Sequence, residues 1–309
     1  MSAMAMQQGP PYPPRTAGPG GRPSIYTDVP IAAVFICLYV GAAAGHMTRF
    51  QLNRKAGHKF VPSALLFGFC MSRILTCSLR IGSATHPNNI SLSIAAGIFL
   101  NAGILLVYVI NILFAQRILR ARQPSVGWNP VLRVVFKLIL VLIVVFLFLL
   151  IPFIVVTFYT RNPSLLNAAR HIQQAAITYF LIVTTLPYWI LLLAFRLPRS
   201  DREETFGTGS LRTKVLILLV GTTLVVYNAV YKAGTTWASP HPVNDPAWYQ
   251  SKASYWCFYF VPEVLVLYFY LFMRIDRRFW VPNGSGERKS YVLEGKKIDE
   301  KDGEREESV

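Results

Sequence analysis

Two arginines stand inside a stretch of the chain that is otherwise apolar, and their charge needs an explanation. The stretch Phe69–Ile81, FCMSRILTCSLRI, contains Arg73 and Arg80. A guanidinium group remains protonated in proteins, so each arginine brings a permanent positive charge into apolar surroundings. Arg73, Cys77 and Arg80 are spaced i, i+4 and i+7, which predicts that they share one face of a helix.

Glu263 is the acidic residue that matches Arg73 in depth. It lies in CFYFVPEVLVLYFY, about 10 residues from the outer end of its apolar run, and Arg73 lies about 12 residues, or roughly 18 Å, into its own run from the opposite side. A charge at the centre of a bilayer costs about 2.5–3.5 kcal/mol on insertion scales. We therefore expect an Arg73–Glu263 ion pair, or a polar cavity that both residues line. A pair that only fastens two helices together is an equally open interpretation.

Four further polar residues complete the candidate site. Arg80 lies near the outer surface, where we expect its guanidinium to extend to the lipid headgroups; together with Lys232 it is also a candidate for binding an anion that enters from outside. Asn101 and Asn228 also lie within apolar runs. Buried amides join helices more often than they bind ligands, so we mainly expect these two side chains to join helices. The candidate ligand-binding residues are Arg73, Arg80, Asn101, Asn228, Lys232 and Glu263.

The sequence lacks the residues that common membrane cofactors require. The last apolar run has no lysine for a retinal Schiff base, and no histidine is positioned for haem between helices. The cysteines form no CxxC motif and lie within apolar runs, which argues against a metal site and against disulfides. We expect no enzyme activity, no cofactor and no metal, with a zinc hydrolase built on three outer histidines as a minor alternative: His86, His171 and His241.

Seven apolar runs must position these residues. The chain of 309 residues is 53% hydrophobic and only 15% charged, which is typical of an integral membrane protein rather than a soluble one. About 20 apolar residues suffice to span a bilayer as a helix. We therefore predict an all-α protein with seven transmembrane helices, near residues 29–47, 61–81, 90–115, 138–158, 172–195, 215–231 and 254–273.

Lysine and arginine are distributed unequally over the connecting segments. Of the 31 basic residues, 23 lie in the segments after the first, third, fifth and seventh runs, and six lie in the opposite set. Basic segments remain in the cytoplasm, so we expect the N-terminus outside and the C-terminus in the cytoplasm. The formal net charge of +16 is explained in this way without nucleic acid as a partner, and anionic lipid is a candidate partner at the cytoplasmic face.

The composition of the chain divides it into four parts. Residues 1–28 are rich in proline and glycine and predict a disordered outer arm, followed by the seven-helix domain 29–273. Residues 274–282 contain basic and aromatic side chains that suit the membrane interface. The charged tail 283–309 is predicted to be disordered in the cytoplasm. Asn89, in the sequence Asn89-Ile90-Ser91, is a candidate for glycosylation on the outer side.

Several motifs are characteristic when taken together: DVPIAAVFICLYV, GHMTRFQLNRKAGHKF, GFCMSRILTCSLRI, NILFAQRILRA, FGTGSLRTK and DPAWYQSKASYW. Over about residues 28 to 282 the chain resembles a family of fungal seven-transmembrane proteins of unknown function, some of which are labelled family-C-like G-protein-coupled receptors. The resemblance implies a fungal source and transfers no functional residue.

These observations favour a receptor-like sensor in the plasma membrane or a secretory-pathway membrane. Its ligand would bind in the outer half of the bundle, and its basic cytoplasmic face would meet a G protein or another signalling partner. Two alternatives stay open. One is a transporter or exporter of lipid or small solutes that uses the Arg73–Glu263 pair. The other is a non-catalytic membrane scaffold.

Overall fold

The computed structural model describes residues 9–292, and these residues fold into helices. Seven helical segments are long and apolar enough to cross a membrane, and no β-strand occurs within residues 9–292. The predicted all-α fold with seven spans is thus confirmed. The spans are α1 (Ile25–Lys55), α2 (Val61–Thr85), a third span Ile90–Arg122, α6 (Pro130–Tyr159), α7 (Pro163–Arg196), α8 (Leu211–Trp237) and a last span Lys252–Phe272.

Two of the spans are composed of more than one helix. The third span consists of α3 (Ile90–Ala102) and α4 (Leu105–Arg122). The last span consists of α9 (Lys252–Tyr255), a π-helical segment (Trp256–Phe260) and α10 (Val261–Phe272). Short helices lie outside the spans: α5 (Pro124–Gly127), a 3-10 turn (Trp248–Gln250), α11 (Ile275–Arg278) and α12 (Ser285–Arg288).

Local sequence explains where several spans begin. The side chains of Asn129 and Asn162 accept hydrogen bonds from backbone N–H groups at the starts of α6 and α7. Proline follows each asparagine at the first helical position, where its missing N–H is no loss. Ser210 caps α8 in the same way, by accepting from the N–H of Thr213 at 3.2 Å.

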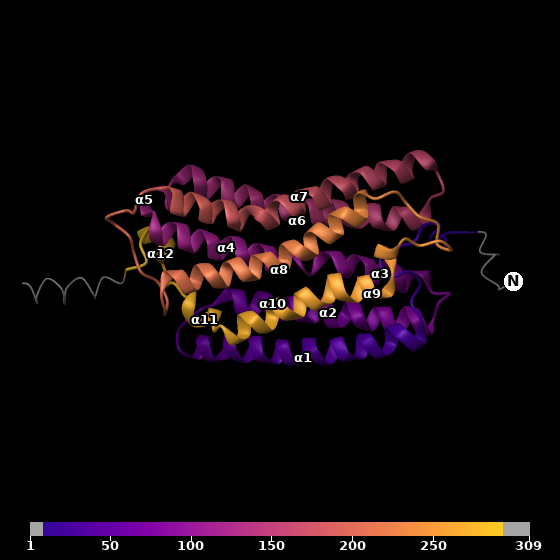
Figure 1. Ribbon diagram of the computed structural model, residues 1–309, viewed down its shortest axis with the longest axis horizontal. Helices are drawn as coiled ribbons and strands as arrows, with labels where there is room; N and C mark the ends of the chain where they lie inside the picture. The colour runs from indigo at the N-terminus through magenta and orange to yellow at the C-terminus, as the bar shows by residue number, and fades with distance from the viewer. Residues whose placement is uncertain (1–8, 293–309) are drawn as a thin grey trace, which may run out of the picture.

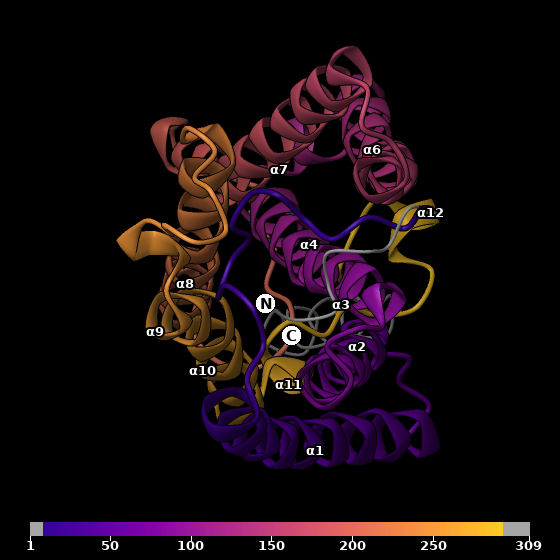
Figure 2. The same cartoon turned by 90° about the vertical axis from the view of Figure 1, so that its right-hand side faces the viewer.

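The spans form one bundle around the third span (Figures 1 and 2). α1 packs along α2, α7 along α8, and α4 contacts α2, α7 and α8. Of the most apolar window of the third span, 61% is buried, against 11% for α6, which packs mainly on α7 at the edge of the bundle. α6 therefore presents most of its apolar surface outward, as expected for a lipid-facing helix.

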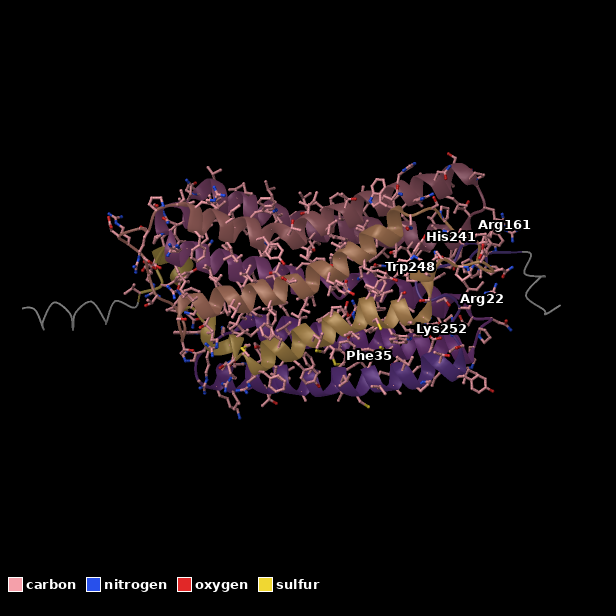
Figure 3. All side chains as sticks on the ribbon, viewed as in Figure 1. Arg22, Phe35, Arg161, His241, Trp248 and Lys252 are labelled. Carbon is pink, nitrogen blue, oxygen red and sulfur yellow. The ribbon has the colours of Figure 1, made fainter. Side chains whose placement is uncertain are left out.

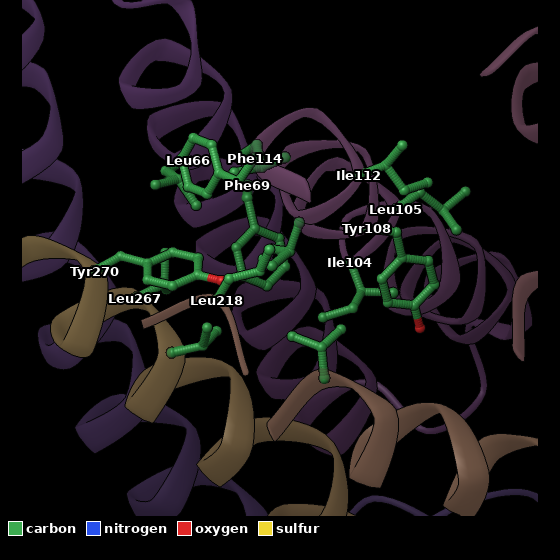
Figure 4. Packing of buried hydrophobic residues seen from close by; sticks show 14 of the residues in the cluster. Leu66, Phe69, Ile104, Leu105, Tyr108, Ile112, Phe114, Leu218, Leu267 and Tyr270 are labelled. Carbon is green, nitrogen blue, oxygen red and sulfur yellow. The ribbon is translucent and has the colours of Figure 1, made fainter. Parts of the chain in front are cut away.

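Aromatic and aliphatic side chains fill the interior between α2, α4, α8 and the last span (Figure 4). Phe114 packs edge-on to Tyr270 and face-to-face with Phe279, at 4.1 Å between ring centroids in the second pair. Tyr270 also fits closely against Gly221 of α8, where a Cβ atom would lie 2.6 Å from Cε1 of the ring. Glycine at this position is what allows α8 and α10 to approach each other.

One end of the bundle, which we call the arm end, is covered by residues 9–24 (Figures 1 and 3). The arm pairs with the loop after α8: the N–H of Ala17 donates to the carbonyl of His241 at 2.9 Å, and the N–H of Val243 donates to the carbonyl of Arg15 at 3.1 Å. Arg161 stacks on the ring of Tyr12 at 4.1 Å. Residues 9–24, which we expected to be disordered, thus lie against the bundle, and residues 1–8 fall outside the described part.

The opposite end, which we call the basic end, carries the loops after α1, α4 and α7 together with residues 274–292. Phe279 is fully buried there, and Tyr291 packs between Trp128 and Phe206. Residues 283–292, which we expected in a disordered tail, are therefore anchored to the bundle, because their aromatic ring fills a gap in its core. The rest of that tail, residues 293–309, lies outside the described residues.

Candidate functional site

Arg73 and Glu263 form a buried ion pair between α2 and α10. Nε of Arg73 lies 2.5 Å from Oε2 of Glu263, and Nη2 lies 2.6 Å from Oε1. The side chains are 0% and 1% exposed. Two parallel N–H···O bonds to one carboxylate are the strongest geometry available to an arginine. The ion pair that the sequence predicted is present.

The remaining N–H groups of Arg73 reach the place where the third span breaks. Nη1 donates to the carbonyls of Phe99 and Leu100, at 3.1 and 3.0 Å. These carbonyls lie at the C-terminal end of α3, where helix termini leave acceptors available; that of Phe99 also accepts from the N–H of Gly103 at 3.4 Å. Arg73 thus has partners for four of its five N–H groups, and the rings of Phe69 and Phe260 flank its guanidinium at 5.2 and 5.8 Å.

The break in the third span was not expected, since the sequence predicted one continuous helix there. Gly103 lies at the break, and a Cβ atom on it would approach Oγ of Ser72 in α2 to 2.7 Å. The close approach of α2 to the break brings Arg73 within reach of the exposed carbonyls. The side chain of Asn101 turns back to the carbonyl of Gly97 at 3.0 Å within its own helix, and it contributes no bond to the ion pair.

A second irregular backbone lies beside the pair, in the last span. Pro262 has no N–H group, so a helix through it leaves the carbonyl four residues earlier without a donor. Asn228 of α8 supplies the missing donor: its Nδ2 bonds the carbonyls of Phe258 and Tyr259 at 3.0 and 2.9 Å. Asn228 therefore secures the π-helical segment, as expected for an amide that joins helices.

Lys232 lies one helical turn after Asn228 in α8, and its side chain approaches the break in the third span. Its Nζ donates to the carbonyl of Leu100 at 3.3 Å and lies 5.0 Å from the ring of Tyr259. Only 3% of the residue is exposed, so Lys232 faces the interior rather than the outer surface where we expected it. The break in the third span consequently receives two cationic side chains, from α2 and from α8.

Arg80 is paired with a carboxylate that sequence analysis missed. Its Nη2 and Nε lie 2.9 and 3.1 Å from Oδ1 of Asp28, and Nη2 also donates to the carbonyl of Gly20 in the arm at 2.8 Å. Lys252 reaches the other oxygen of Asp28 at 2.7 Å. Arg80 is only 7% exposed, so it does not extend to the headgroups as we expected: an internal anion is available to it.

Two signals in the sequence pointed to the missed residues. Asp28 lies in the first turn of α1, which begins at Ile25, whereas the apolar run in the sequence begins one residue after Asp28. Tyr39 stands among small apolar residues, and its hydroxyl donates to Oε2 of Glu263 at 3.2 Å. Tyrosine in an apolar run usually has a partner for its hydroxyl, but the sequence does not say which one.

The outer histidines do not assemble into a metal site. Within residues 9–292, no three His, Cys, Asp or Glu side chains lie together in a group that could hold a metal ion. Asn89 precedes α3 and is exposed at the arm end, where it lines an open hollow of about 580 Å³ with Pro11 and His86. The sequon is therefore on the same end as the arm.

The central arrangement is enclosed and fixed rather than open to solvent. Glu263 accepts from Arg73 and Tyr39, and the rings of Phe69, Phe260 and Tyr259 surround the cationic groups. Charges inside a protein are tolerated when they are paired in this way. Removing one partner leaves the other charge buried and unpaired, which strongly destabilises the fold. The pair, with the hydroxyl of Tyr39, is suited to holding α1, α2 and the last span in one relative position.

Comparison with known proteins gives a similarity in the C-terminal part of the chain. Residues 207–280 match a family model described as a protein of unknown function, DUF3112. The matched region includes α8 and the last span, and hence Asn228, Lys232 and Glu263. No curated protein matches the chain, and no solved structure does. The chain is thus an integral membrane protein with seven apolar helices that is similar over residues 207–280 to a family of unknown function.

Proposed function

We propose that this protein is a receptor-like sensor whose resting conformation is held by the Arg73–Glu263 pair. The observation that carries the proposal is the position of this pair: it links α2 to the last span between two irregular backbones, the α3–α4 break and the π-helical segment. Irregular helical turns are frequent at functional sites, and an ionisable residue inside a membrane span is by default a candidate for function.

The arm end supports a mechanism for sensing. A ligand in the outer half of the bundle, among Arg80, Lys232 and the arm, would compete for cationic groups that are now bonded to Asp28 and to the carbonyl of Leu100. A ligand shifts a conformational equilibrium only by its difference in affinity for the two states. An anionic ligand that bonds Arg80 in place of Asp28 would favour the state in which the arm is released.

We assign the basic end to the cytoplasm, in the plasma membrane or a secretory-pathway membrane. The excess of lysine and arginine in the loops and C-terminal segment at this end supports the assignment. A G protein or another cytoplasmic signalling protein is the proposed partner there. The proposal includes no catalytic step.

A carrier for lipid or small solutes is the second candidate, and one observation favours it. Secondary transporters often place a charged site beside irregular helical backbone, and the third and last spans each contain one irregular turn, at residues 103–104 and at Trp256–Phe260. In a carrier the Arg73–Glu263 pair would open and close during transport. In a scaffold, the third candidate, the pair would serve stability alone.

Proximity labelling with an enzyme fused after Val309 tests the three candidates. The samples are the wild type, Glu263→Gln, the charge-swapped double variant Arg73→Glu with Glu263→Arg, and Glu203→Gln as a control in a half-buried loop pair. For a receptor, Glu263→Gln changes the set of labelled signalling proteins, the swapped variant restores it, and Glu203→Gln leaves it unchanged. Unchanged labelling in all folded variants contradicts the receptor, and loss of solute or lipid flux in Glu263→Gln then identifies a carrier.

A further inference from the structure

The basic end contains a cavity of about 300 Å³ that the proposed sensor mechanism does not use. It lies between the last turns of α4, the start of α2 and the C-terminal segment. Three cationic side chains line it, Lys59, Arg117 and Arg120, and no aspartate or glutamate does. Its other polar or aromatic lining residues include Gln116, Trp128, Trp280, Asn283, Ser285 and Tyr291.

The cations around this cavity are held in place without a carboxylate. Nη1 of Arg117 donates to the carbonyl of Phe279, and its guanidinium lies 5.7 Å from the ring of Phe60. Nε of Arg120 donates to the carbonyl of Gly127 at 3.3 Å, and its guanidinium stacks on Trp128 at 4.3 Å. Each arginine is therefore fixed by one carbonyl and one ring. The rest of its N–H fork makes no hydrogen bond to any residue between 9 and 292, and this geometry suits a planar or tetrahedral anion.

The arrangement differs from that of the buried Arg73 and Arg80, and it resembles that of Lys214, whose Nζ donates to the carbonyl of Phe206. Arg73, Arg80 and Arg122 each contact a carboxylate, whereas no described carboxylate lies within ion-pair distance of Lys59, Arg117 or Arg120. Glu204 contacts Tyr291, which lines the cavity. The two carboxylate oxygens of Glu204 accept from the N–H of Tyr291 at 2.7 Å and from Oγ of Ser290 at 2.8 Å. The positive charge of the cavity is thus left without an internal counterion in the described part of the chain.

The tryptophans of the cavity wall contribute their rings rather than their N–H groups. Trp128 and Trp280 line the cavity, and Trp128 is only 7% exposed. Nε1 of each lies beneath the surface that a water-sized acceptor reaches. An anion in the cavity would therefore bond the basic side chains and pack against the indole rings.

We propose that this cavity is a binding site for a phosphate-bearing anion, held by the basic side chains of Lys59, Arg117 and Arg120. The phosphate belongs to a lipid headgroup or is free in solution, and the two share the same recognition chemistry. Tryptophans at helix ends are typical of the membrane interface, which places the cavity at headgroup level. The inference does not depend on the receptor proposal. Only the possibility that the ligand is a lipid headgroup relies on the proposed sidedness.

The test measures binding to the full chain in nanodiscs, by intrinsic tryptophan fluorescence and by thermal unfolding. The probes are inorganic phosphate added to phosphatidylcholine discs, and phosphatidylinositol 4-phosphate built into the discs. We expect saturable binding of at least one probe, which raises the unfolding temperature and weakens as salt is added. Saturation by inorganic phosphate alone identifies a site for free phosphate, and a response to the lipid alone identifies a headgroup site.

Three variants locate the binding. Arg120→Gln and Lys59→Gln each remove a cation from the cavity wall. Each is expected to weaken binding about tenfold or more, because bonds to a charged group contribute about 1.5–3 kcal/mol. Arg212→Gln is the matched control, an exposed cation at the same end that does not line the cavity. The proposal is overturned if neither probe binds, or if Arg212→Gln weakens binding as much as Arg120→Gln does.

Discussion

At the residue scale, the carboxylates buried inside the bundle, Glu263 and Asp28, are each paired with arginine. Arg73 meets a carboxylate, two carbonyls and two rings, and Asp28 meets both Arg80 and Lys252. An isolated charge in low-dielectric surroundings is far less stable than a paired one. Forming such a pair therefore contributes little net stability, whereas removing one partner destabilises the protein strongly, because the other charge is left buried and unpaired.

The Glu263→Gln variant should unfold at a distinctly lower temperature than the wild type. The change leaves the guanidinium of Arg73 buried without its carboxylate, which costs about 3–5 kcal/mol. Thermal unfolding in detergent or nanodiscs measures the loss. Replacing both residues by apolar ones, Arg73→Met with Glu263→Leu, should recover much of it, because no uncompensated charge remains. An unfolding temperature that does not change in Glu263→Gln would contradict the pairing.

The Asp28→Asn variant should release the arm from the bundle. It removes the anion that Arg80 and Lys252 share, while Arg80 keeps its bond to Gly20 only. We expect trypsin to cleave faster at Arg15 and Arg22, which is measured as the loss of an N-terminal tag. Asp245→Asn is the control, since Asp245 is exposed at the same end and forms no ion pair with a described residue. Equal cleavage rates in the two variants would show that Asp28 does not secure the arm.

At the element scale, the bundle depends on irregular helices that side chains repair. The third span breaks at Gly103, and Arg73 and Lys232 bond the carbonyls that the break exposes. The last span loosens into a π-helical segment before Pro262, and Asn228 bonds the carbonyls there. In a membrane such backbone groups are tolerated only where protein satisfies them. The polar side chains of α2 and α8 thus make both discontinuities stable.

Two glycines of α8 should respond to alanine in opposite ways. A Cβ atom on Gly221 would clash with Tyr270, whose hydroxyl donates to Oδ1 of Asn111 at 2.5 Å, whereas nothing lies within 4 Å of a Cβ on Gly234. Gly221→Ala should destabilise the protein by about 1–3 kcal/mol. Gly234→Ala should be neutral or stabilise it by up to about 1 kcal/mol, because alanine is the better helix former. Thermal unfolding distinguishes them, and a stable Gly221→Ala would show that Tyr270 moves away freely.

At the scale of the whole molecule, the two ends of the bundle differ in charge and in cover. The arm end is closed by residues 9–24, and the basic end is closed by residues 274–292, whose rings of Phe279 and Tyr291 are buried in the bundle. Burial raises the pKa of Tyr291, against the opposing effect of the nearby Arg120 and Arg117. The hydroxyl therefore stays protonated at neutral pH, which leaves the positive charge of the basic end uncompensated by this residue.

Staining of terminal tags should place the two ends on opposite sides of the membrane. With the basic end in the cytoplasm, an antibody should reach an N-terminal tag on intact cells, and a tag after Val309 only once the membrane is permeabilised. A protein that carries both tags provides the control, because permeabilised cells should stain for both tags and so show that each one is present. The reverse pattern would contradict the proposed sidedness and would also remove the argument for a cytoplasmic lipid in the basic cavity.

The sequence alone determined that the chain forms seven membrane-spanning helices, because apolar length and helix formation are local properties. It also predicted the Arg73–Glu263 pair, since two opposite charges at one depth have few other partners. It missed the roles of Asp28 and Tyr39 and the contacts of residues 9–24, because the partner of a polar side chain on another segment is not a local property of the sequence.

Only the tertiary structure decided where the helices break and which groups meet there. Gly103 lies at the break, and Oγ of Ser72 on another helix leaves no room for a Cβ atom there. The bonds from Arg73 and Lys232 join residues 26 to 132 positions apart in the chain. The cavity at the basic end is likewise formed by α2, α4 and the C-terminal segment together. Such contacts depend on how the spans pack. The apolar pattern of the sequence fixes the number of spans but not how they are arranged.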